Sequence, residues 1–296
     1  MDEDYDNETG VTLESVQLAA IPLANKLPRG YLSVSQVTQF LKCAAAYSFR
    51  YVEGITVPGN NYTIQGRAVH KAAETLHLSM IQEVLKTGQL TSEAEMESVY
   101  SDTHDKELVD NSELLLIDVP GWGQVKDEGL MLTRQYRKGA LGDLANPDTG
   151  FPLLKIQPVA AELTVKVALT PEGREPIPFL GVIDLEEVDA IVDLKNKKKA
   201  CTQAEADNSL QLTLYAHIRG KSVVRLDQLV KPTKTKGVRY IRTQSYRNTK
   251  DVKHALHVVQ GVTDAIVAGN FMRTNPENWW CSSKWCAYWG SCRGKD

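Results

Sequence analysis

The sequence predicts an α/β fold in which a small mixed β-sheet is flanked by helices and carries a helical insertion. Three observations support this prediction. Helical periodicity dominates before residue 156, β-type runs follow to about residue 196, and helical and β-type runs then alternate to residue 268. With 296 residues, of which 42% are hydrophobic and 24% charged, the chain has the composition of a globular protein and is long enough for one large domain.

The N-terminal end is expected to be an acidic arm. Residues 1–14 contain six acidic residues and no Lys or Arg, so we expect residues 1–27 to form a flexible arm and residues 28–296 to form one domain. The net charge of the whole chain is -3, and much of this negative charge lies in the arm. The negative net charge therefore does not exclude nucleic acid as a partner.

Helices are expected over most of the first half of the domain. Residues 31–42 have the pattern of a helix that Ser33 or Ser35 could cap. Residues 66–87 repeat apolar side chains near a 3.6-residue period, which predicts a second helix. The acidic stretch that follows predicts further helices, and we assign residues 85–155 to a helical insertion.

β-Strands are expected from residue 156 onward. Residues 156–168, 179–188 and 190–196 have β-type patterns separated by turn residues, which predicts an antiparallel meander. The remaining expected elements are a helix, two strands and a final long helix, at 208–219, 221–229, 237–242 and 249–268.

Two adjacent predicted strands carry a group of charged side chains, in Gly181-Val-Ile-Asp184 and Asp193-Leu-Lys195. Because strand side chains alternate, Asp193 and Lys195 project from the same face. Asp184, Asp193 and the Leu194 carbonyl could bind a hard divalent cation through oxygen. The Lys195 ammonium could hold an attacking water, so the group suits metal-assisted phosphodiester hydrolysis. An exposed hairpin with an ordinary ion pair would show the same spacing.

Four short motifs occur in order across residues 31–295. They are Gly66-Arg-Ala-Val-His70, Gly181-Val-Ile-Asp184, Asp193-Leu-Lys195 and Gln211-Leu-Thr-Leu-Tyr215. In this order they resemble the motifs of the PD-(D/E)XK nuclease superfamily, specifically its RecB-like exonuclease branch, which includes the iron-sulfur nucleases of CRISPR adaptation and AddB-type nuclease domains. The resemblance implies a restriction-endonuclease-like core and a metal-dependent DNA nuclease, most often an exonuclease acting on DNA ends or single strands.

The resemblance also implies a metal site. It makes His70 a metal ligand together with Asp184 and Asp193, and an imidazole ligand favours Mn²⁺ over Mg²⁺. A single helical histidine can equally be a structural residue. Glu162 stands where the family often has an acid one strand before the Asp184 motif, so it is a candidate for an outer position or for a second metal.

Three further residues receive catalytic roles from the resemblance. Lys195 corresponds to the catalytic lysine. Gln211 and Tyr215 lie one helical turn apart on one face, so both could reach the lysine, the water or the DNA backbone. A polar helix edge with no catalytic role would have the same spacing.

Four of the five cysteines are candidates for a metal cluster. They are Cys43, after the first predicted helix, and Cys281, Cys286 and Cys292 in the segment 279–292. The resemblance implies that these four hold a [4Fe–4S] cluster that joins the two ends of the domain, although the C-terminal spacing is Cx4Cx5C where the family usually has CxxCx5C. Four thiolates also suit a structural zinc ion. Cys201 has no partner by position and is expected to be a free thiol.

A basic stretch predicts a surface for nucleic acid. Residues 231–254 contain eight basic side chains and one acidic side chain. The candidate contacts are Lys231, Lys234, Lys236, Arg239, Arg242 and Arg247. Tyr240 and Tyr246 are interleaved with them and could stack on bases. An ordinary solvated surface is the alternative.

No apolar run approaches the roughly 20 residues of a membrane helix, and the acidic N-terminus does not resemble a secretory signal. We therefore expect a cytoplasmic protein with no membrane partner. DNA recombination, repair or processing is the expected setting, with a helicase, an annealing protein or another recombination protein as a candidate partner. Two other functions stay open: a non-catalytic DNA-binding or assembly module with the nuclease fold, and a zinc-containing regulator that uses only the basic stretch.

Overall fold

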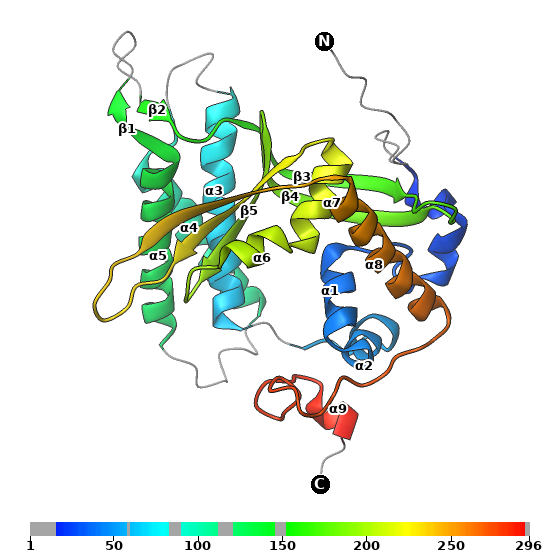
Figure 1. Cartoon of the computed structure of the whole chain (residues 1–296). Helices are drawn as coiled ribbons and strands as arrows, with labels where there is room; N and C mark the ends of the chain where they lie inside the picture. Colours follow the sequence, from blue (N-terminus) through cyan, green and yellow to red (C-terminus); the bar gives the residue numbers. More distant parts are fainter. Residues whose placement is uncertain (1–15, 58–59, 83–89, 112–120, 146–151, 294–296) are drawn as a thin grey trace, which may run out of the picture.

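The computed structural model describes residues 16–57, 60–82, 90–111, 121–145 and 152–293. Its centre is a five-stranded sheet with the order β3-β4-β5-β6-β7 (Figure 1). The strands are β3 (Pro158–Leu169), β4 (Ile177–Glu187), β5 (Ala190–Lys197), β6 (Val223–Val230) and β7 (Arg239–Tyr246). β5 and β6 are parallel and all other neighbours are antiparallel, which confirms the predicted mixed sheet and its initial meander.

Helices cover both faces of this sheet (Figure 1). One group packs on one face and consists of α3 (Asn61–Gln82), α4 (Glu93–Asp110) and α5 (Trp122–Ala140). The other group consists of α1 (Val34–Lys42), α7 (Leu210–Arg219) and α8 (Thr249–Val267). Strand side chains alternate between the two cores: Ile191 joins the α7 side, and Val192 joins the α3 side.

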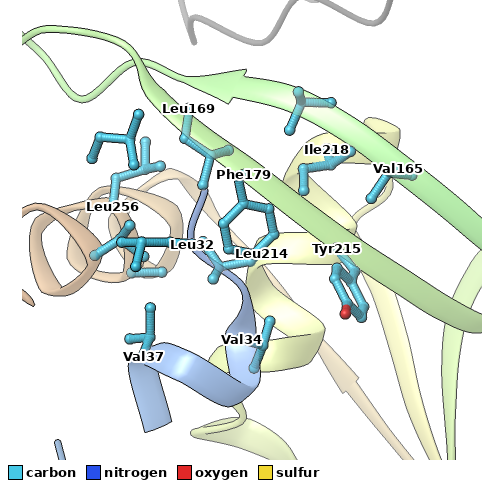
Figure 2. Packing of buried hydrophobic residues seen from close by; sticks show 14 of the residues in the cluster. Leu32, Val34, Val37, Val165, Leu169, Phe179, Leu214, Tyr215, Ile218 and Leu256 are labelled. Atoms are coloured by element: carbon cyan, nitrogen blue, oxygen red, sulfur yellow. The ribbon is translucent and has the colours of Figure 1, made fainter. Parts of the chain in front are cut away.

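The core around α1, α7 and α8 is assembled from distant parts of the chain. Figure 2 shows Phe179 extending from β4 toward Leu32, which precedes α1, and Leu214 of α7. Leu32 also pairs with β4, away from the residues that pair with β5, because its N–H donates to the Pro178 carbonyl at 2.9 Å. The start of the domain is therefore fixed beside β4 and α7.

Local sequence signals explain where α1 and α7 begin. Ser33 caps α1 by accepting from the Gln36 N–H at 3.4 Å, and Ser209 caps α7 by accepting from the Leu212 N–H at 3.3 Å. α7 ends at Gly220, whose φ of 63° is favourable for glycine. α6 (Gln203–Asp207) is a short helix that the sequence analysis did not predict.

Two expectations about chain organisation are wrong. The arm was expected to extend to residue 27, but 3-10 helices cover Leu18–Ala20 and Pro22–Lys26, and Leu23 and Leu27 are buried in the core. Apolar side chains at these positions outweigh the acidic composition of the preceding stretch. Residues 1–15 lie outside the described residues.

The insertion is not entirely helical. α4 and α5 lie within 85–155, but β1 (Leu141–Ala145) and β2 (Pro152–Leu154) form a two-stranded antiparallel sheet at its end. Asn, Pro and Gly between these short runs are turn formers, a signal that favours a hairpin over a helix. Residues 83–89, 112–120 and 146–151, over which the second helix and the insertion were also predicted, lie outside the described residues.

The remaining short elements are α2 (Ala44–Tyr47), a π-helix at Ser48–Val52 and α9 (Trp289–Arg293). Among the described helices, none combines the length and apolar character needed to cross a membrane.

Candidate active site

The candidate site lies where β4 and β5 separate. The two strands pair only at Leu185↔Val192 and Glu186↔Ile191. Beyond these pairs, the Asp184 Oδ2 atom accepts from the Leu194 N–H at 2.9 Å and so replaces a backbone partner. Because the N–H and C=O of a strand residue point to the same side, the Leu194 carbonyl faces this opening too. The separation therefore directs polar groups of both strands into one place.

His70, Glu162 and Asp184 form a potential metal site. The Nδ1 atom of His70 lies 3.7 Å from Glu162 Oε1 and 3.7 Å from Asp184 Oδ2. One ligand atom from each of these residues lies within 4.8 Å of the other two, and this is the only such group of His, Cys, Asp or Glu side chains among the described residues. One imidazole and two carboxylates form a suitable donor set for Mn²⁺ or Mg²⁺.

The two carboxylates come from neighbouring antiparallel strands. The pairs Ala161↔Leu185 and Leu163↔Ile183 place Glu162 directly opposite Asp184. Like charges in this position repel each other. Glu162 also has a φ of 46°, and it is the only non-glycine residue with a positive φ in the described parts of the chain. Backbone strain of this kind is concentrated at functional sites, and a bound cation would relieve the repulsion.

The charge of His70 depends on these acids. Burial alone would lower the pKa of its imidazole, but Glu162 and the negative charge of Asp184 outweigh that effect, so the pKa is raised above its ordinary value. α3 carries His70 across β3 to reach both acids.

Asp193, Lys195 and Gln211 form a connected group beside the metal site. Asp193 Oδ1 accepts from Lys195 Nζ at 2.8 Å and from Gln211 Nε2 at 2.8 Å. Asp193 is buried, with 2% of its surface exposed, and burial together with the charge of Asp184 raises its pKa to about 7 despite the opposing effect of Lys195. Burial opposes the charged form of Lys195, but Asp193 and Asp184 raise its pKa overall, so the ammonium remains charged.

Tyr215 contributes differently from Gln211. Its ring is buried against Gly181, and its hydroxyl accepts from the Val182 N–H at 3.3 Å. A Cβ atom on Gly181 would lie 2.6 Å from Tyr215 Cε1. The motif that contains Tyr215 therefore requires a residue without a side chain at position 181. Tyr215 in turn positions β4 next to Asp184.

Four cysteines lie around one cavity, as the sequence pattern suggested for a cluster. The cavity is lined by Cys43, Cys281, Cys286 and Cys292, together with aromatic and polar side chains. Cys43 ends α1, and burial together with the other three thiols raises the pKa of Cys286. Cys201 lies elsewhere, in a cavity shared with Asp193 and Lys195.

The structure divides the predicted basic surface into two sets. Lys231 and Arg247 are buried: Lys231 Nζ lies 2.5 Å from Glu128 Oε1, and Arg247 donates to the Ala206 carbonyl at 2.6 Å. Arg242 lies 3.7 Å from Glu187 and donates to the Lys155 carbonyl at 2.8 Å. These three side chains serve packing, because their charges are directed to partners within the fold.

Lys234, Lys236 and Arg239 are exposed. Lys234 and Lys236 lie in the connection between β6 and β7, and Arg239 is the first residue of β7. Both strands contact α5 (Figure 1). Tyr240 is mostly buried and donates to Asp227, whereas Tyr246 is exposed. The predicted basic surface is therefore smaller than its sequence suggested.

Lys197 was missed by the sequence analysis. It lines the cavity that contains Asp193 and Lys195. The Lys-rich run that follows Lys195 in the sequence was a signal for it.

Comparison with known proteins supports a single family. Residues 31–293 match the model of the PD-(D/E)XK nuclease superfamily. No curated protein matches the chain.

Two solved structures show limited similarity. A protein from Eubacterium rectale that is named for an expected exonuclease activity shares 14% identity, with a TM-score of 0.46 over 87% of this chain and 88% of that one. A protein designated SSO0001 also shares 14% identity, with a TM-score of 0.35 over 76% of this chain and 97% of that one. The family match extends from before α1 to the end of α9 and includes every element of the site, so the chain belongs to the PD-(D/E)XK nuclease superfamily.

Proposed function

We propose that the protein is a metal-dependent deoxyribonuclease that acts as an exonuclease on DNA ends or single strands. The observation that carries this proposal is the convergence of His70, Glu162 and Asp184 ligand atoms within 4.8 Å, beside the bonded pair of Asp193 and Lys195. Membership of a nuclease superfamily supports phosphodiester hydrolysis as the reaction.

The proposed cation is Mn²⁺ or Mg²⁺. His70, Glu162 and Asp184 would hold it, and the Leu194 carbonyl faces the same opening. Asp193, which the sequence analysis also expected as a ligand, is not part of this group, and its Oδ1 atom is occupied by Lys195 and Gln211. When bound, such a cation polarises the phosphate and stabilises the charge on the leaving oxygen. Glu162, which the sequence analysis considered for an outer position or a second metal, is thus proposed as a direct ligand of this cation.

The protein side chains would position the other reactants. Asp193 fixes the Lys195 ammonium, which donates to the attacking water and offsets negative charge on the phosphate. Because the pKa of Lys195 is raised, it acts as a donor and not as the base. Gln211 holds Asp193 from α7, and Tyr215 keeps β4 in place.

We further propose that Cys43, Cys281, Cys286 and Cys292 hold a [4Fe–4S] cluster. Contacts that already hold the two ends of the domain together support this proposal. The Ala45 N–H donates to the Met272 carbonyl at 3.1 Å, and the centroids of the stacked Phe49 and Tyr288 rings lie 5.8 Å apart. Such a cluster would join α1 to the C-terminal segment. Metal analysis of protein purified without oxygen distinguishes it from zinc.

Variants of the proposed ligands test the nuclease function. Asp184→Asn and Glu162→Gln should each lower Mn²⁺-dependent cleavage of end-labelled DNA by at least ~10²-fold, comparable to the loss of one electrostatic stabiliser of a transition state. DNA affinity should change little, because these residues serve chemistry more than docking.

The matched control is Glu172→Gln, since Glu172 is exposed and lies before β4 in the turn after β3. It should cleave at the wild-type rate. Near-normal turnover in both ligand variants would show that this group is not the active site.

A further inference from the structure

A second feature of the site is a cavity of about 580 Å³ between α1, β4 and α7. Gln211 and Tyr215 form part of its wall, so it adjoins the proposed catalytic group directly. In Figure 2 the Tyr215 hydroxyl points away from the apolar cluster. The volume falls within the range of about 300–1,000 Å³ that is usual for ligand sites.

The lining of this cavity favours an anion. Arg29 contributes a positive charge, and among the described residues no carboxylate lines the cavity. The hydroxyls of Ser33 and Ser35 lie 3.0 Å apart on the same wall and supply donors for oxygen atoms. The adjacent metal site, by contrast, is rich in carboxylates.

Two guanidinium groups pack on the Tyr51 ring; Tyr51 and Arg29 line this cavity, whereas Arg50 lies outside its lining. The Cζ atoms of Arg29 and Arg50 lie 4.9 Å and 5.3 Å from the centre of the Tyr51 ring. Neither arginine forms an ion pair with any residue in the described parts of the chain, whereas Arg219 and Arg225 have carboxylate partners. Two like charges at one ring with no internal counter-ion fit an external anion such as a phosphate.

The cavity also offers surfaces for a base. The side chain of Tyr31 is partly exposed and lines it, whereas the Tyr51 ring already packs against Arg29 and Arg50. Stacking on aromatic rings is the sequence-tolerant way in which proteins hold single-stranded bases.

The space continues past Gln211. A second cavity of about 560 Å³ contains Asp193, Lys195 and Lys197, and it shares Ser209 and Gln211 with the first. The two cavities therefore lie on either side of Ser209 and Gln211, and the second one contains Lys195, which would contact the scissile phosphate.

We propose that the first cavity binds one nucleotide of the substrate strand, next to the scissile bond. Arg29 binds its phosphate, with Arg50 as a second cation on the same tyrosine ring, and Tyr31 contacts its base. The strand then passes Gln211 and reaches Lys197 in the second cavity. This assignment rests on the proposed nuclease function and gives its substrate a path near α7, independent of the connection between β6 and β7.

Binding of deoxyadenosine monophosphate to the full chain tests this inference without any cleavage. Calorimetry without divalent cations should detect binding, and the double variant Arg29→Gln with Arg50→Gln should weaken it by about tenfold or more, since charge-assisted hydrogen bonds to the phosphate are lost. Both arginines are exposed, so the variant should fold normally. Arg174→Gln is the control, because Arg174 is paired with Asp264 on the surface.

Inorganic phosphate is the second probe. Tyr31→Leu should weaken the mononucleotide by about tenfold through lost stacking and leave phosphate binding unchanged, because Arg29 and Arg50 pack on Tyr51 and not on Tyr31. An unchanged affinity in the arginine variant would overturn the site, and equal effects of Tyr31→Leu on both probes would overturn the base contact.

Cleavage assays separate this inference from the nuclease proposal. In the arginine variant the KM for single-stranded DNA should rise with little change in kcat, and in Arg174→Gln it should not. If the arginine variant keeps the wild-type KM while Lys195→Ala is inactive, the nucleotide site is wrong and the nuclease stands. If the wild-type chain cleaves no DNA but binds the mononucleotide through both arginines, the nuclease proposal is wrong and the binding site stands.

Discussion

Gly181→Ala should lower both the stability of the fold and the activity of the site, because the added Cβ would clash with Tyr215 of α7. The new Cβ would lie 2.6 Å from Cε1 and 3.1 Å from the hydroxyl oxygen of Tyr215, closer than normal contact. The Tyr215 ring is only 5% exposed, so it cannot move freely into solvent. Any shift also lengthens the 3.3 Å hydrogen bond from the Val182 N–H to the Tyr215 hydroxyl.

The expected cost follows from these two effects. Overpacking a buried site costs about 1–3 kcal/mol, and a lost hydrogen bond adds about 0.5–1.5 kcal/mol. We therefore expect the free energy of unfolding to fall by about 2–4 kcal/mol, with a loss of activity because Asp184 lies three residues after Gly181 on the displaced strand.

Urea unfolding followed by circular dichroism measures this cost. Gly261→Ala is the control: nothing lies within 4 Å of the added Cβ, and alanine should stabilise α8 by about 0.5–1 kcal/mol. In a Tyr215→Leu background, the cost of Gly181→Ala should fall by at least about 1 kcal/mol. Wild-type stability in Gly181→Ala, or equal costs in both backgrounds, would refute the clash.

Three further predictions address pH, the basic surface and the cysteines. Burial, with a smaller effect of His70, lowers the pKa of His77 to about 3, and its Nε2 atom lies 2.6 Å from the Tyr136 hydroxyl. Between pH 6.5 and about 3 the unfolded chain therefore binds a proton at His77 that the folded chain does not. The free energy of unfolding should fall by up to about 1.4 kcal/mol for each pH unit of acidification in this range. His77→Gln should reduce this dependence when unfolding is measured at a series of acidic pH values. If Lys234, Lys236 and Arg239 contact DNA, neutralising all three should reduce the log-log salt dependence of single-strand binding by about 0.7 per lost phosphate contact, whereas an unchanged slope would place the strand elsewhere. Protein purified without oxygen should contain about four irons per chain and lose them in Cys43→Ser but not in Cys201→Ser; stoichiometric zinc without iron would contradict the cluster.

The sequence predicted that Asp184 and Asp193 lie on adjacent antiparallel strands, because alternation and turn residues are local signals. Alternation along β5 was enough to place Asp193 and Lys195 on one face, and the structure joins them at 2.8 Å. The glycine and tyrosine motifs, each weak alone, correspond to a single contact between Gly181 and Tyr215.

Charge composition was a poorer guide, because it does not show which charges are already paired. Lys231 and Arg247 come from the most basic stretch, yet both are buried with internal partners. Arg29 and Arg50 lie in unremarkable sequence, yet their lack of an acidic partner among the described residues makes them the stronger candidates for binding an anion.

The position of Glu162 also needed the structure. Its strained backbone and its register opposite Asp184 depend on how β3 pairs with β4, which no single segment encodes. The pairing of β3 with β4 is therefore the reason why Glu162 is now proposed as a ligand and not as an outer residue.

The central claim is that the group formed by His70, Glu162, Asp184, Asp193 and Lys195 hydrolyses phosphodiester bonds. The most direct measurement is cleavage of end-labelled single- and double-stranded DNA by wild-type protein and by Lys195→Ala, each with Mn²⁺, Mg²⁺ or EDTA. We predict cleavage by the wild type with Mn²⁺ or Mg²⁺, none with EDTA, and a strong loss of turnover in Lys195→Ala with metal binding retained, because an ammonium is not a ligand. Cleavage that persists in EDTA, or equal rates in the wild type and Lys195→Ala, would contradict the claim.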